Sequence, residues 1–381
     1  MRAYLDHAST SPLRPIALDA MLPYLREHFG DPGRLHHEGR VTRVALETAR
    51  EQVAAFLGAR PREIVFTSGG TEAVNTAVGG AVARHVMHAP AGAGRPRIVT
   101  TAVEHSSVLD ACRREPVDVT ECGVDRLGRF DPTEIAEEIV ADTALVSVQL
   151  ANHEVGTVQD VAAVTAAAGD HDAVVHVDAC AALGHIPVDF ASLDADLMSV
   201  TAHKLGGPAG VGALVVRRGL RIPPLLVGGA QERARRAGLE NVAAIVGFGA
   251  VAGSLDDAAR DREANQARRQ TSRILEAATA LDGVSQLGDA ELRLPHIVCL
   301  GIDDVEAEPV LLGLDQRGLA VHSGSSCSSE SLEPSPVLAA MGVDADRSLR
   351  ISVGWSTGDD DVERFGGAFG PVVRQLRTLR G

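Results

Sequence analysis

The sequence predicts an α/β protein, with a mostly parallel sheet in a large domain and a smaller α+β domain beside it. Between residues 61 and 217, short runs rich in β-branched residues alternate with helical stretches, as in parallel sheets covered by helices. The chain has 381 residues, which is too long for one ordinary hydrophobic core. We therefore expect a large sheet domain with a smaller partner.

Each expected strand of the large domain is a short apolar run. The runs are residues 64–67, 97–101, 145–150, 174–177, 196–200 and 213–216. Polar residues follow several of them, at 68–71, 104–105, 152, 178 and 201–204. In open α/β sheets, ligands bind beyond the carboxyl ends of the strands. These polar residues are therefore expected to converge on one crevice.

The second domain follows a long, charged helical stretch at about residues 255–281. This stretch leads into a shorter α+β region that contains Cys327 and Arg350. We expect residues 15–255 to form the large domain, and residues 1–14 and 256–381 to form the small one.

Composition and charge argue against two classes of function, membrane association and nucleic-acid binding. Hydrophobic residues make up 45% of the chain and charged residues 23%, and no apolar run approaches the ~18 residues that a membrane span requires. The N-terminal residues lack the apolar stretch of a signal peptide, so a cytoplasmic location is expected. The net charge of −15 opposes a broad phosphate-binding surface. Neither membrane association nor direct binding of nucleic acid is expected.

The five cysteines show no CxxC pair and no metal-ligand spacing, so neither a metal site nor a disulfide framework is predicted. Four of them lie in apolar or segment-edge contexts typical of small buried side chains. They are Cys112, Cys122, Cys180 and Cys299. Cys327 instead lies in a Gly/Ser-rich stretch that predicts an exposed, mobile loop. An exposed thiol is a liability unless it is used.

Lys204 is the only lysine among the 36 basic residues. A guanidinium stays protonated and does not form a Schiff base, so Arg cannot replace Lys where a primary amine is needed. The segment from Thr67 to Glu72 follows an expected strand and opens a helix. Its glycines and the hydroxyl of Thr71 favour a phosphate cradle, although the same residue types also make ordinary turns and helix caps. No Walker A lysine follows it.

A carboxylate and the lysine complete a set that pyridoxal phosphate (PLP) requires. His-Val-Asp ends an apolar strand at Asp178, and Thr-Ala-His-Lys ends another at Lys204. A PLP site needs a lysine, an acid that keeps the pyridine nitrogen protonated, and a phosphate cradle. All three are present, and we therefore expect PLP as the cofactor.

The chain resembles the NifS/IscS-type cysteine desulfurases of group I, in the class V aminotransferase branch of PLP fold type I. The matching segments are residues 4–10, 64–72, 104–105, 152–156 (Asn-His-Glu-Val-Gly), 176–178, 202–204 and 323–334. The resemblance implies a mixed, mostly parallel seven-stranded sheet flanked by helices. It also implies a homodimer that converts L-cysteine to L-alanine and passes the sulfur to an acceptor protein. Relatives serve iron–sulfur clusters, tRNA thiolation or, for DndA-type enzymes, sulfur modification of DNA.

The resemblance also implies roles for individual residues. His105 would stack on the pyridine ring and serve in proton transfer, and Asn152 would face the cofactor O3′ and the substrate. Arg350 would clamp the substrate carboxylate, and the Cys327 thiolate would receive the sulfur as a persulfide. The phosphate would be held by Gly70, Thr71, Thr201 and His203.

Three positions depart from the family pattern. Ala181 stands where the family usually has Gln, and Leu239 stands where a Thr reaches the phosphate of the neighbouring subunit's cofactor. His153 replaces the second Asn of an Asn-Asn-Glu pattern. Two alternatives stay open. Another class V PLP enzyme, such as an aminotransferase or selenocysteine lyase, would need no Cys327, and a non-catalytic scaffold would tolerate an eroded cofactor pocket.

Overall fold

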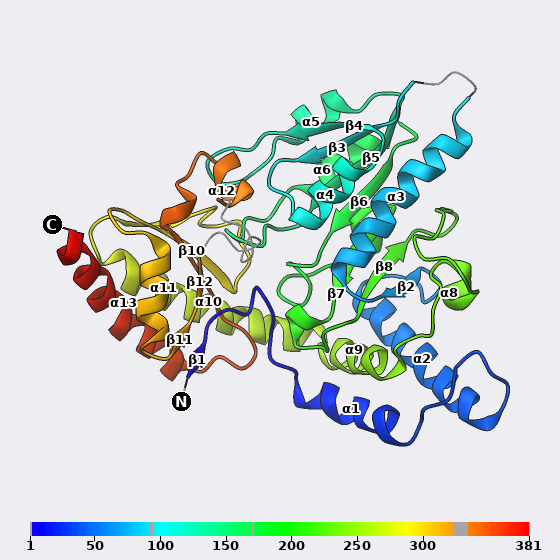
Figure 1. Cartoon of the computed structure of the whole chain (residues 1–381), viewed down its shortest axis with the longest axis horizontal. Helices are drawn as coiled ribbons and strands as arrows, with labels where there is room; N and C mark the ends of the chain where they lie inside the picture. The colour runs from blue at the N-terminus through cyan, green and yellow to red at the C-terminus, as the bar shows by residue number, and fades with distance from the viewer. Residues whose placement is uncertain (1, 91–93, 170, 324–333, 381) are drawn as a thin grey trace.

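The computed structural model describes residues 2–90, 94–169, 171–323 and 334–380. The chain forms two lobes, and both of its ends lie in the smaller one (Figure 1). The larger lobe contains a seven-stranded sheet, and the smaller one contains a four-stranded antiparallel sheet. The N-terminal segment runs from the small lobe across to the first helix of the large one, so the beginning of the chain joins the two lobes.

The large sheet has the strand order β2-β8-β7-β6-β5-β3-β4. Its strands are β2 (Ile64–Thr67), β3 (Arg97–Thr101), β4 (Asp118–Cys122), β5 (Thr143–Gln149), β6 (Val174–Asp178), β7 (Leu197–Thr201) and β8 (Gly212–Val216). Only β8 runs antiparallel to its neighbours. The mixed, mostly parallel sheet predicted from the sequence is confirmed. The sequence prediction missed β4, an edge strand whose residues are mostly exposed or half-buried, so it has no apolar run.

Helices cover both faces of this sheet, which is why its strands are apolar on both sides. Alternate strand residues such as Val65 and Leu145 pack with α3 (Gly70–His88) and α4 (Ser106–Arg114). The intervening residues, such as Phe66 and Val146, face the opposite core. That core is built with α2 (His37–Phe56), α6 (Val161–Ala168) and α9 (Val242–Ser254). The other helices described in the lobe are α1 (Pro15–Arg26), α5 (Pro132–Glu138), α7 (Phe190–Leu193) and α8 (Gln231–Ala234).

The small lobe begins with α10 (Asp257–Thr279), the charged helix expected from the sequence. Its sheet contains β12 (His322–Ser323), β13 (Ser348–Ser352), β10 (Ile297–Ile302) and β9 (Val284–Leu287), in that order. A further pair joins β1 (Ala3–Tyr4) to β11 (Leu319–Ala320) in parallel. The remaining helices are α11 (Ala307–Asp315), α12 (Pro336–Ala340) and α13 (Asp359–Arg380).

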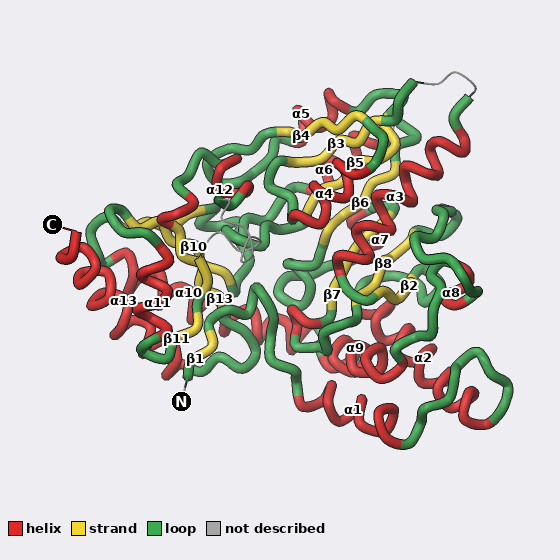
Figure 2. The backbone as a smooth tube through the Cα atoms, viewed as in Figure 1, coloured by secondary structure: helices red, strands yellow, loops and turns green. Residues whose placement is uncertain are grey.

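The small lobe has a hydrophobic core of its own. Figure 2 shows α10, α11 and α13 beside its short strands, and residues such as Leu300, Leu349, Phe365 and Phe369 form this core. Within the described ranges, no single helix is long and apolar enough to span a membrane. Helices α9 and α10 together have the required length and composition, but they are bent by 85° where they meet.

Candidate active site

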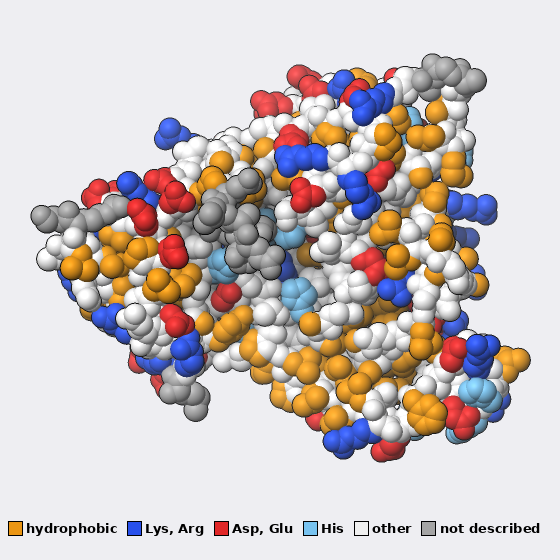
Figure 3. All heavy atoms as spheres, in the orientation of Figure 1, with side chains coloured by type: hydrophobic (Ala, Val, Ile, Leu, Met, Phe, Trp, Pro, Cys, Tyr) orange, Lys and Arg blue, Asp and Glu red, His pale blue; other side chains and the backbone are white. Residues whose placement is uncertain are grey.

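A cavity of about 250 Å³ lies at the carboxyl ends of the central strands, where the small lobe faces the large sheet. The space-filling view shows a hollow between the lobes with histidine side chains on its walls (Figure 3). Eight of the ten predicted site residues line the cavity: Gly70, Thr71, His105, Asp178, Thr201, His203, Lys204 and Arg350. The structure thus brings together residues from four strand ends of the large lobe and one strand of the small lobe.

Asp178 ends β6 and forms the floor of the cavity. Its Oδ1 accepts hydrogen bonds from the backbone N–H of Cys180 (3.0 Å) and from Ser199 Oγ (3.1 Å). Burial raises the pKa of Asp178, but the Cys180 hydrogen bonds and the nearby His176 and His105 outweigh this effect and hold the pKa below its usual value. Both of these bonds use Oδ1, and Asp178 lines the cavity, so an ionised carboxylate faces the space in which a ligand would bind.

A buried chain of hydrogen bonds supports Asp178 from below. Ser199 Oγ also lies 3.1 Å from His176 Nε2, and His176 Nδ1 lies 2.8 Å from Ser147 Oγ. Burial lowers the pKa of His176 to about 4, although the Asp178 charge opposes this shift. A neutral imidazole therefore bridges two hydroxyls, and the network fixes Asp178 without adding a positive charge. We name Asp178, Ser199, His176 and Ser147 the floor network.

The wall beside the floor has the features of an anion cradle. Helix α3 begins at Gly70, so its first backbone N–H groups and its positive dipole end face the cavity. A Cβ atom at Gly70 would come within 2.7 Å of Cys180 Sγ, so a larger residue would not fit there. Thr201 Oγ1 is buried and has no hydrogen-bond partner within the described part of the chain. A buried hydroxyl without a partner is costly, and a phosphate oxygen would satisfy it.

His203 and Lys204 follow Thr201 on the same wall. His203 Nδ1 lies 3.2 Å from Thr10 Oγ1. Burial, and then the charge of Lys204, lowers the pKa of His203 to about 4, so the ring is neutral near pH 7. A neutral ring can still donate a hydrogen bond from the nitrogen that carries its proton. Lys204 therefore provides the positive charge of this segment.

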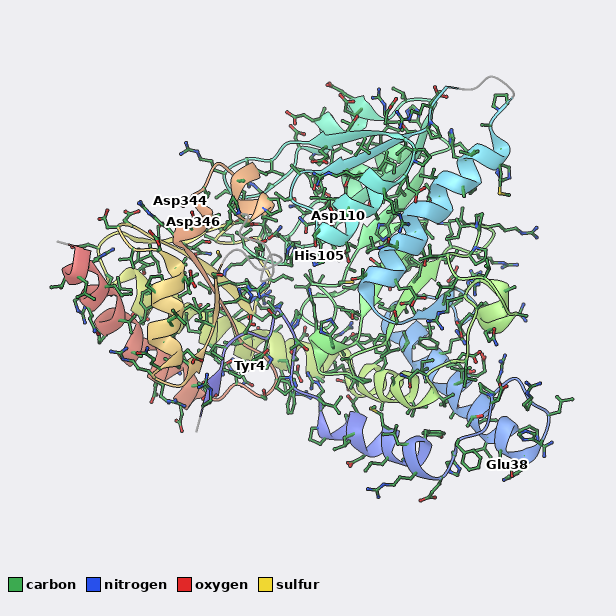
Figure 4. The ribbon with its side chains drawn as sticks, in the orientation of Figure 1. Tyr4, Glu38, His105, Asp110, Asp344 and Asp346 are labelled. Carbon is green, nitrogen blue, oxygen red and sulfur yellow. The ribbon has the colours of Figure 1, made fainter. Side chains whose placement is uncertain are left out.

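His105 caps the N-terminus of α4. Its Nδ1 accepts the backbone N–H of Ser107 at 3.0 Å and lies 2.8 Å from Ser107 Oγ. The neutral ring therefore carries its proton on Nε2. Figure 4 shows His105 between the large sheet and the small lobe, at the start of α4.

Arg350 reaches the cavity from β13 of the small lobe and is almost fully buried. Its Nη2 donates to Asp6 Oδ1 (2.9 Å) and Ser9 Oγ (2.7 Å), and its Nη1 donates to the carbonyl oxygen of His153 (2.9 Å). Its Nε is buried and has no hydrogen-bond partner among the residues that the structure describes. The guanidinium is thus held in one orientation and keeps a donor for a carboxylate.

Two predicted site residues do not lie in the described cavity wall. Asn152 is buried, and its amide closes a local turn by accepting from the N–H groups of Glu154 and Val155 and donating to Val103. Its role toward a cofactor stays a prediction. Cys327 lies outside the described residues.

The positions that depart from the family differ in location. Ala181 lines the cavity and contributes no polar group. Leu239 is 64% exposed and lies outside the cavity of this single chain.

Sequence reasoning did not assign five polar residues of the cavity wall to the site, namely Ser9, Ser107, Gln149, His153 and Cys180. Cys180 was expected to be a small buried side chain, and it is buried. Its place in the cavity wall could have been inferred from the sequence, because it lies two residues after Asp178. In the structure, its backbone N–H donates to Asp178 Oδ1. Burial, and then the Asp178 charge, raises the pKa of this thiol well above its usual value, so it stays protonated.

Comparison with known proteins places the chain in a family. The model of the family "Aminotransferase class-V" matches residues 3–365. The chain belongs to this family. Among its relatives, "Cysteine desulfurase IscS" of Dictyoglomus turgidum is 40% identical over 99% of this chain and 95% of the relative. "Putative cysteine desulfurase IscS 1" of Bacillus subtilis is 40% identical over 98% of this chain and 99% of the relative.

Solved structures of class-V relatives have the same fold. One described as a "NifS-like protein" superposes with a TM-score of 0.90 at 30% identity and covers 99% of this chain and 100% of that chain. A second, "SspA in complex with cysteine", has a TM-score of 0.80 at 28% identity and covers 92% of this chain and 98% of that chain. The likeness extends through both lobes, as expected for one family.

Proposed function

We propose that this class-V protein is a PLP-dependent cysteine desulfurase, which converts L-cysteine to L-alanine and transfers the sulfur to Cys327. The observation that carries the proposal is that the only lysine of the chain shares one cavity with an ionised, buried aspartate and an anion cradle. The names of the relatives at 40% identity support the same activity. From Cys327 the sulfur would pass to an acceptor protein of iron–sulfur cluster assembly, tRNA thiolation or DNA phosphorothioation.

The cavity fits PLP. Lys204 supplies the primary amine, and the ionised Asp178 carboxylate suits a protonated ring nitrogen. The unsatisfied Thr201 hydroxyl and the open helix end at Gly70 suit a phosphate, and Thr71 and His203 would add donors. When bound, PLP draws electrons from the Cα atom of the amino acid joined to it.

Three residues of the cavity would have separate roles in the reaction. Arg350 would bind the substrate carboxylate, a bidentate task suited to a guanidinium. Lys204 would hold the cofactor and release it to the substrate amine. His105 would donate a hydrogen bond or a proton from Nε2, the nitrogen that carries its proton.

Cys327 would complete the reaction. Its thiolate would attack the sulfur of the bound cysteine, so that an S–S bond forms as the C–S bond breaks. The electron pair of the C–S bond stays on carbon, which takes a proton and leaves as alanine.

We further propose a homodimer that acts in the cytoplasm. We propose as the contact face the large apolar side chains that are exposed on α1, on α2, in the segment between them and in the segments before and after α8. They are Ile16, Leu18, Leu25, Phe29, Leu35, Val44, Leu225, Leu226, Val227 and Leu239. Figure 3 shows hydrophobic atoms gathered on the lower part of the large lobe. Burial of this face in a second copy would place Leu239 near the partner's cofactor.

The domain division is part of the same proposal. We propose a large domain of residues 15–255 and a small domain of residues 1–14 and 256–381. The separate hydrophobic core of the small lobe supports this division.

Three proteins compared side by side test the function: the wild-type chain, Lys204→Ala and Cys327→Ser. Alanine, sulfide and the visible absorbance of the cofactor are measured after L-cysteine is added. We expect Lys204→Ala to lose both products. Cys327→Ser should still change the cofactor absorbance when cysteine is added, but release no sulfide.

Two outcomes would favour the alternatives. Sulfide release at the wild-type rate from Cys327→Ser would indicate a lyase. A wild-type chain that neither takes up PLP nor forms alanine would indicate a non-catalytic scaffold.

A further inference from the structure

The backbone of the turn that carries Lys204 is held by two residues of the N-terminal segment. The carbonyl oxygens of residues 203–206 all accept hydrogen bonds from this segment. Ser11 donates to the first two of them, from its backbone N–H (3.0 Å) and from Oγ (2.9 Å). Arg14 donates to the last two, from Nε and from its backbone N–H, both at 2.8 Å. The position of this turn therefore depends on Ser11 and Arg14.

The same N-terminal segment is bound to the small lobe, from which it crosses to the large one (Figure 1). Arg14 forms two hydrogen bonds with Glu263 of α10, at 2.7 and 2.6 Å, and its guanidinium carbon lies 5.4 Å from the ring centroid of Trp355. Trp355 follows β13 and donates from Nε1 to the carbonyl oxygen of Pro12 (2.9 Å). A bidentate pair of this kind fixes both distance and orientation. The small lobe thus holds the residues that hold the lysine turn.

The segment also binds the proposed substrate clamp. Arg350 Nη2 donates to Asp6 Oδ1 (2.9 Å) and to Ser9 Oγ (2.7 Å). Residues 6–14 therefore contact Arg350 at one end and the turn of Lys204 at the other.

A stacked pair of histidine rings makes a second connection between the lobes. His185 lies in the segment after β6 of the large lobe, and His296 directly precedes β10 of the small lobe. Their ring centroids are 3.4 Å apart, and the ring planes are inclined by 16°. His185 also hydrogen-bonds to the backbone of Lys204. A ring of the small lobe is thus packed on a ring that contacts the lysine turn.

Both rings are uncharged near pH 7, which allows them to stack so closely. Burial, and then the charges of His7 and Arg14, lowers the pKa of His185 to about 3. Burial, and then the charge of His185, lowers the pKa of His296 well below its usual value. Together with Lys204 the two rings line a cavity of about 20 Å³, which has room for about one water molecule. The packing behind the lysine is therefore tight.

We infer that Ser11, Arg14 and His185 are positioning residues for Lys204, and that through them the small lobe sets the place of the lysine in the cavity. The small lobe also carries Arg350, so the lysine amine and the site for the substrate carboxylate keep a fixed separation. The inference rests on the proposed function for the roles of Lys204 and Arg350. We name the residues of this connection the joint, which consists of Ser11, Arg14, His185, Glu263 and His296.

Hydrogen exchange in the cofactor-free, full-length chain tests whether the small lobe stabilises the lysine turn. Glu263→Ala removes the ion pair with Arg14 and should raise exchange in the peptide of residues 203–207 by about tenfold. Glu363→Ala breaks an ion pair with Arg273 elsewhere in the small lobe and should leave this peptide unchanged. Exchange that does not rise in Glu263→Ala, or that rises equally in both variants, would overturn the connection.

The visible absorbance of the PLP-loaded protein tests whether the lysine is displaced. The pH midpoint of the absorbance change depends on the environment of the lysine nitrogen joined to the cofactor. His296→Ala removes the stack and should shift this midpoint by about half a pH unit or more. His296→Phe keeps a flat ring and should restore most of the shift, and His171→Ala, at an exposed position, should cause none. The same titration is made on Glu263→Ala, whose side chain is 33% exposed, and should show a shift in the same range. Wild-type midpoints in both His296→Ala and Glu263→Ala would overturn the inference.

Steady-state kinetics then separates placement of the lysine from binding of the substrate. His185→Ala and His296→Ala should each lower kcat for alanine formation by about tenfold, with a smaller change in KM. The double variant should lose little more than either single one, because both remove the same stack. Wild-type kcat in both single variants would overturn the inference. A wild-type chain that bound PLP but formed no alanine would refute the proposed function, while the exchange and absorbance measurements would still decide the role of the joint.

Discussion

The floor and the rim of the cavity differ in how their polar atoms are held. In the floor network, Asp178, Ser199, His176 and Ser147 are buried and joined by hydrogen bonds of 2.8–3.1 Å. We call the two positions that depart from the family the rim. Ala181 lines the cavity, whereas Leu239 is exposed and lies outside the cavity of this single chain, and neither carries a polar group. Both departures at the rim replace a polar family residue. Loss of a polar group at the rim leaves no buried partner unsatisfied within this chain. Loss of one residue of the floor network would leave the next residue of the network buried without a hydrogen-bond partner.

The largest effect is expected at the floor. Asp178→Asn keeps an oxygen that can accept the Cys180 and Ser199 hydrogen bonds, but it removes the negative charge that faces the cavity. A neutral amide does not hold a proton on the ring nitrogen of PLP, so kcat/KM for alanine formation should fall by about a hundredfold or more.

Asp110→Asn, an exposed position on α4, is the matched control and should leave kcat/KM unchanged. Near-wild-type turnover in Asp178→Asn would show that the charge of Asp178 is not needed for the reaction.

Acid should destabilise the cofactor-free protein through its buried histidines. Burial lowers the pKa of His7, His176 and His203 to about 4 and that of His185 to about 3, from 6.5. Between pH 6.5 and about 4, the unfolded state binds protons that the folded state does not, so stability falls as the pH decreases. Each histidine should contribute on the order of 1–3 kcal/mol.

Urea unfolding at a series of pH values checks this expectation. The slope of the unfolding free energy against pH reports the number of protons taken up on unfolding. His176→Gln should lower this number by about one, and His171→Gln, at an exposed position, should leave it unchanged. A stability that does not change between pH 7 and 4 would contradict the buried, neutral state of these rings.

A smaller effect is expected at the rim. In the proposed homodimer, Leu239→Thr would restore a hydroxyl near the partner's phosphate and should slow the loss of PLP by roughly fivefold, or about 1 kcal/mol. Leu292→Thr is a matched control, because Leu292 is 60% exposed and Leu239 is 64% exposed. Release of PLP is measured by absorbance after dilution. An equal effect of both substitutions would show that Leu239 does not face a cofactor.

The smallest effect concerns the segment that leads to Leu239. Ala234 has a φ of +62°, in the left-handed region that favours glycine. Ala234→Gly should therefore raise the free energy of unfolding by about 1 kcal/mol. Ala230, in the same segment, has a φ of −99°, and Ala230→Gly should not stabilise the chain. Thermal unfolding of both variants measures this difference, and equal stabilisation by the two substitutions would contradict a specific effect at Ala234.

Structure could be predicted from the sequence where the same requirement, such as burial, applies to several consecutive residues. The buried strands are apolar on both faces, so their positions could be predicted, and the polar residues at their ends fell into one cavity. The exposed edge strand β4 lacked that pattern and was missed.

Contacts between distant parts of the chain could not be predicted. Asp6 and Arg350 are 344 positions apart, and Ser335 and Glu154 are 181 positions apart, yet each pair is hydrogen-bonded. The Asn152 amide illustrates a further limit, because the turn that engages it depends on local backbone geometry rather than on residue type.

The central claim is that the sulfur of cysteine moves to Cys327, and peptide mass spectrometry of the PLP-loaded chain after a single turnover tests it most directly. Burial raises the pKa of Cys112 and Cys299 to about 12 and that of Cys122 to about 11, and it also raises the pKa of Cys180. These four thiols should therefore stay protonated and unmodified. We predict one additional sulfur atom, found only on the peptide that contains Cys327. Additional sulfur on the Cys180 peptide, or alanine formed without any persulfide, would contradict the account.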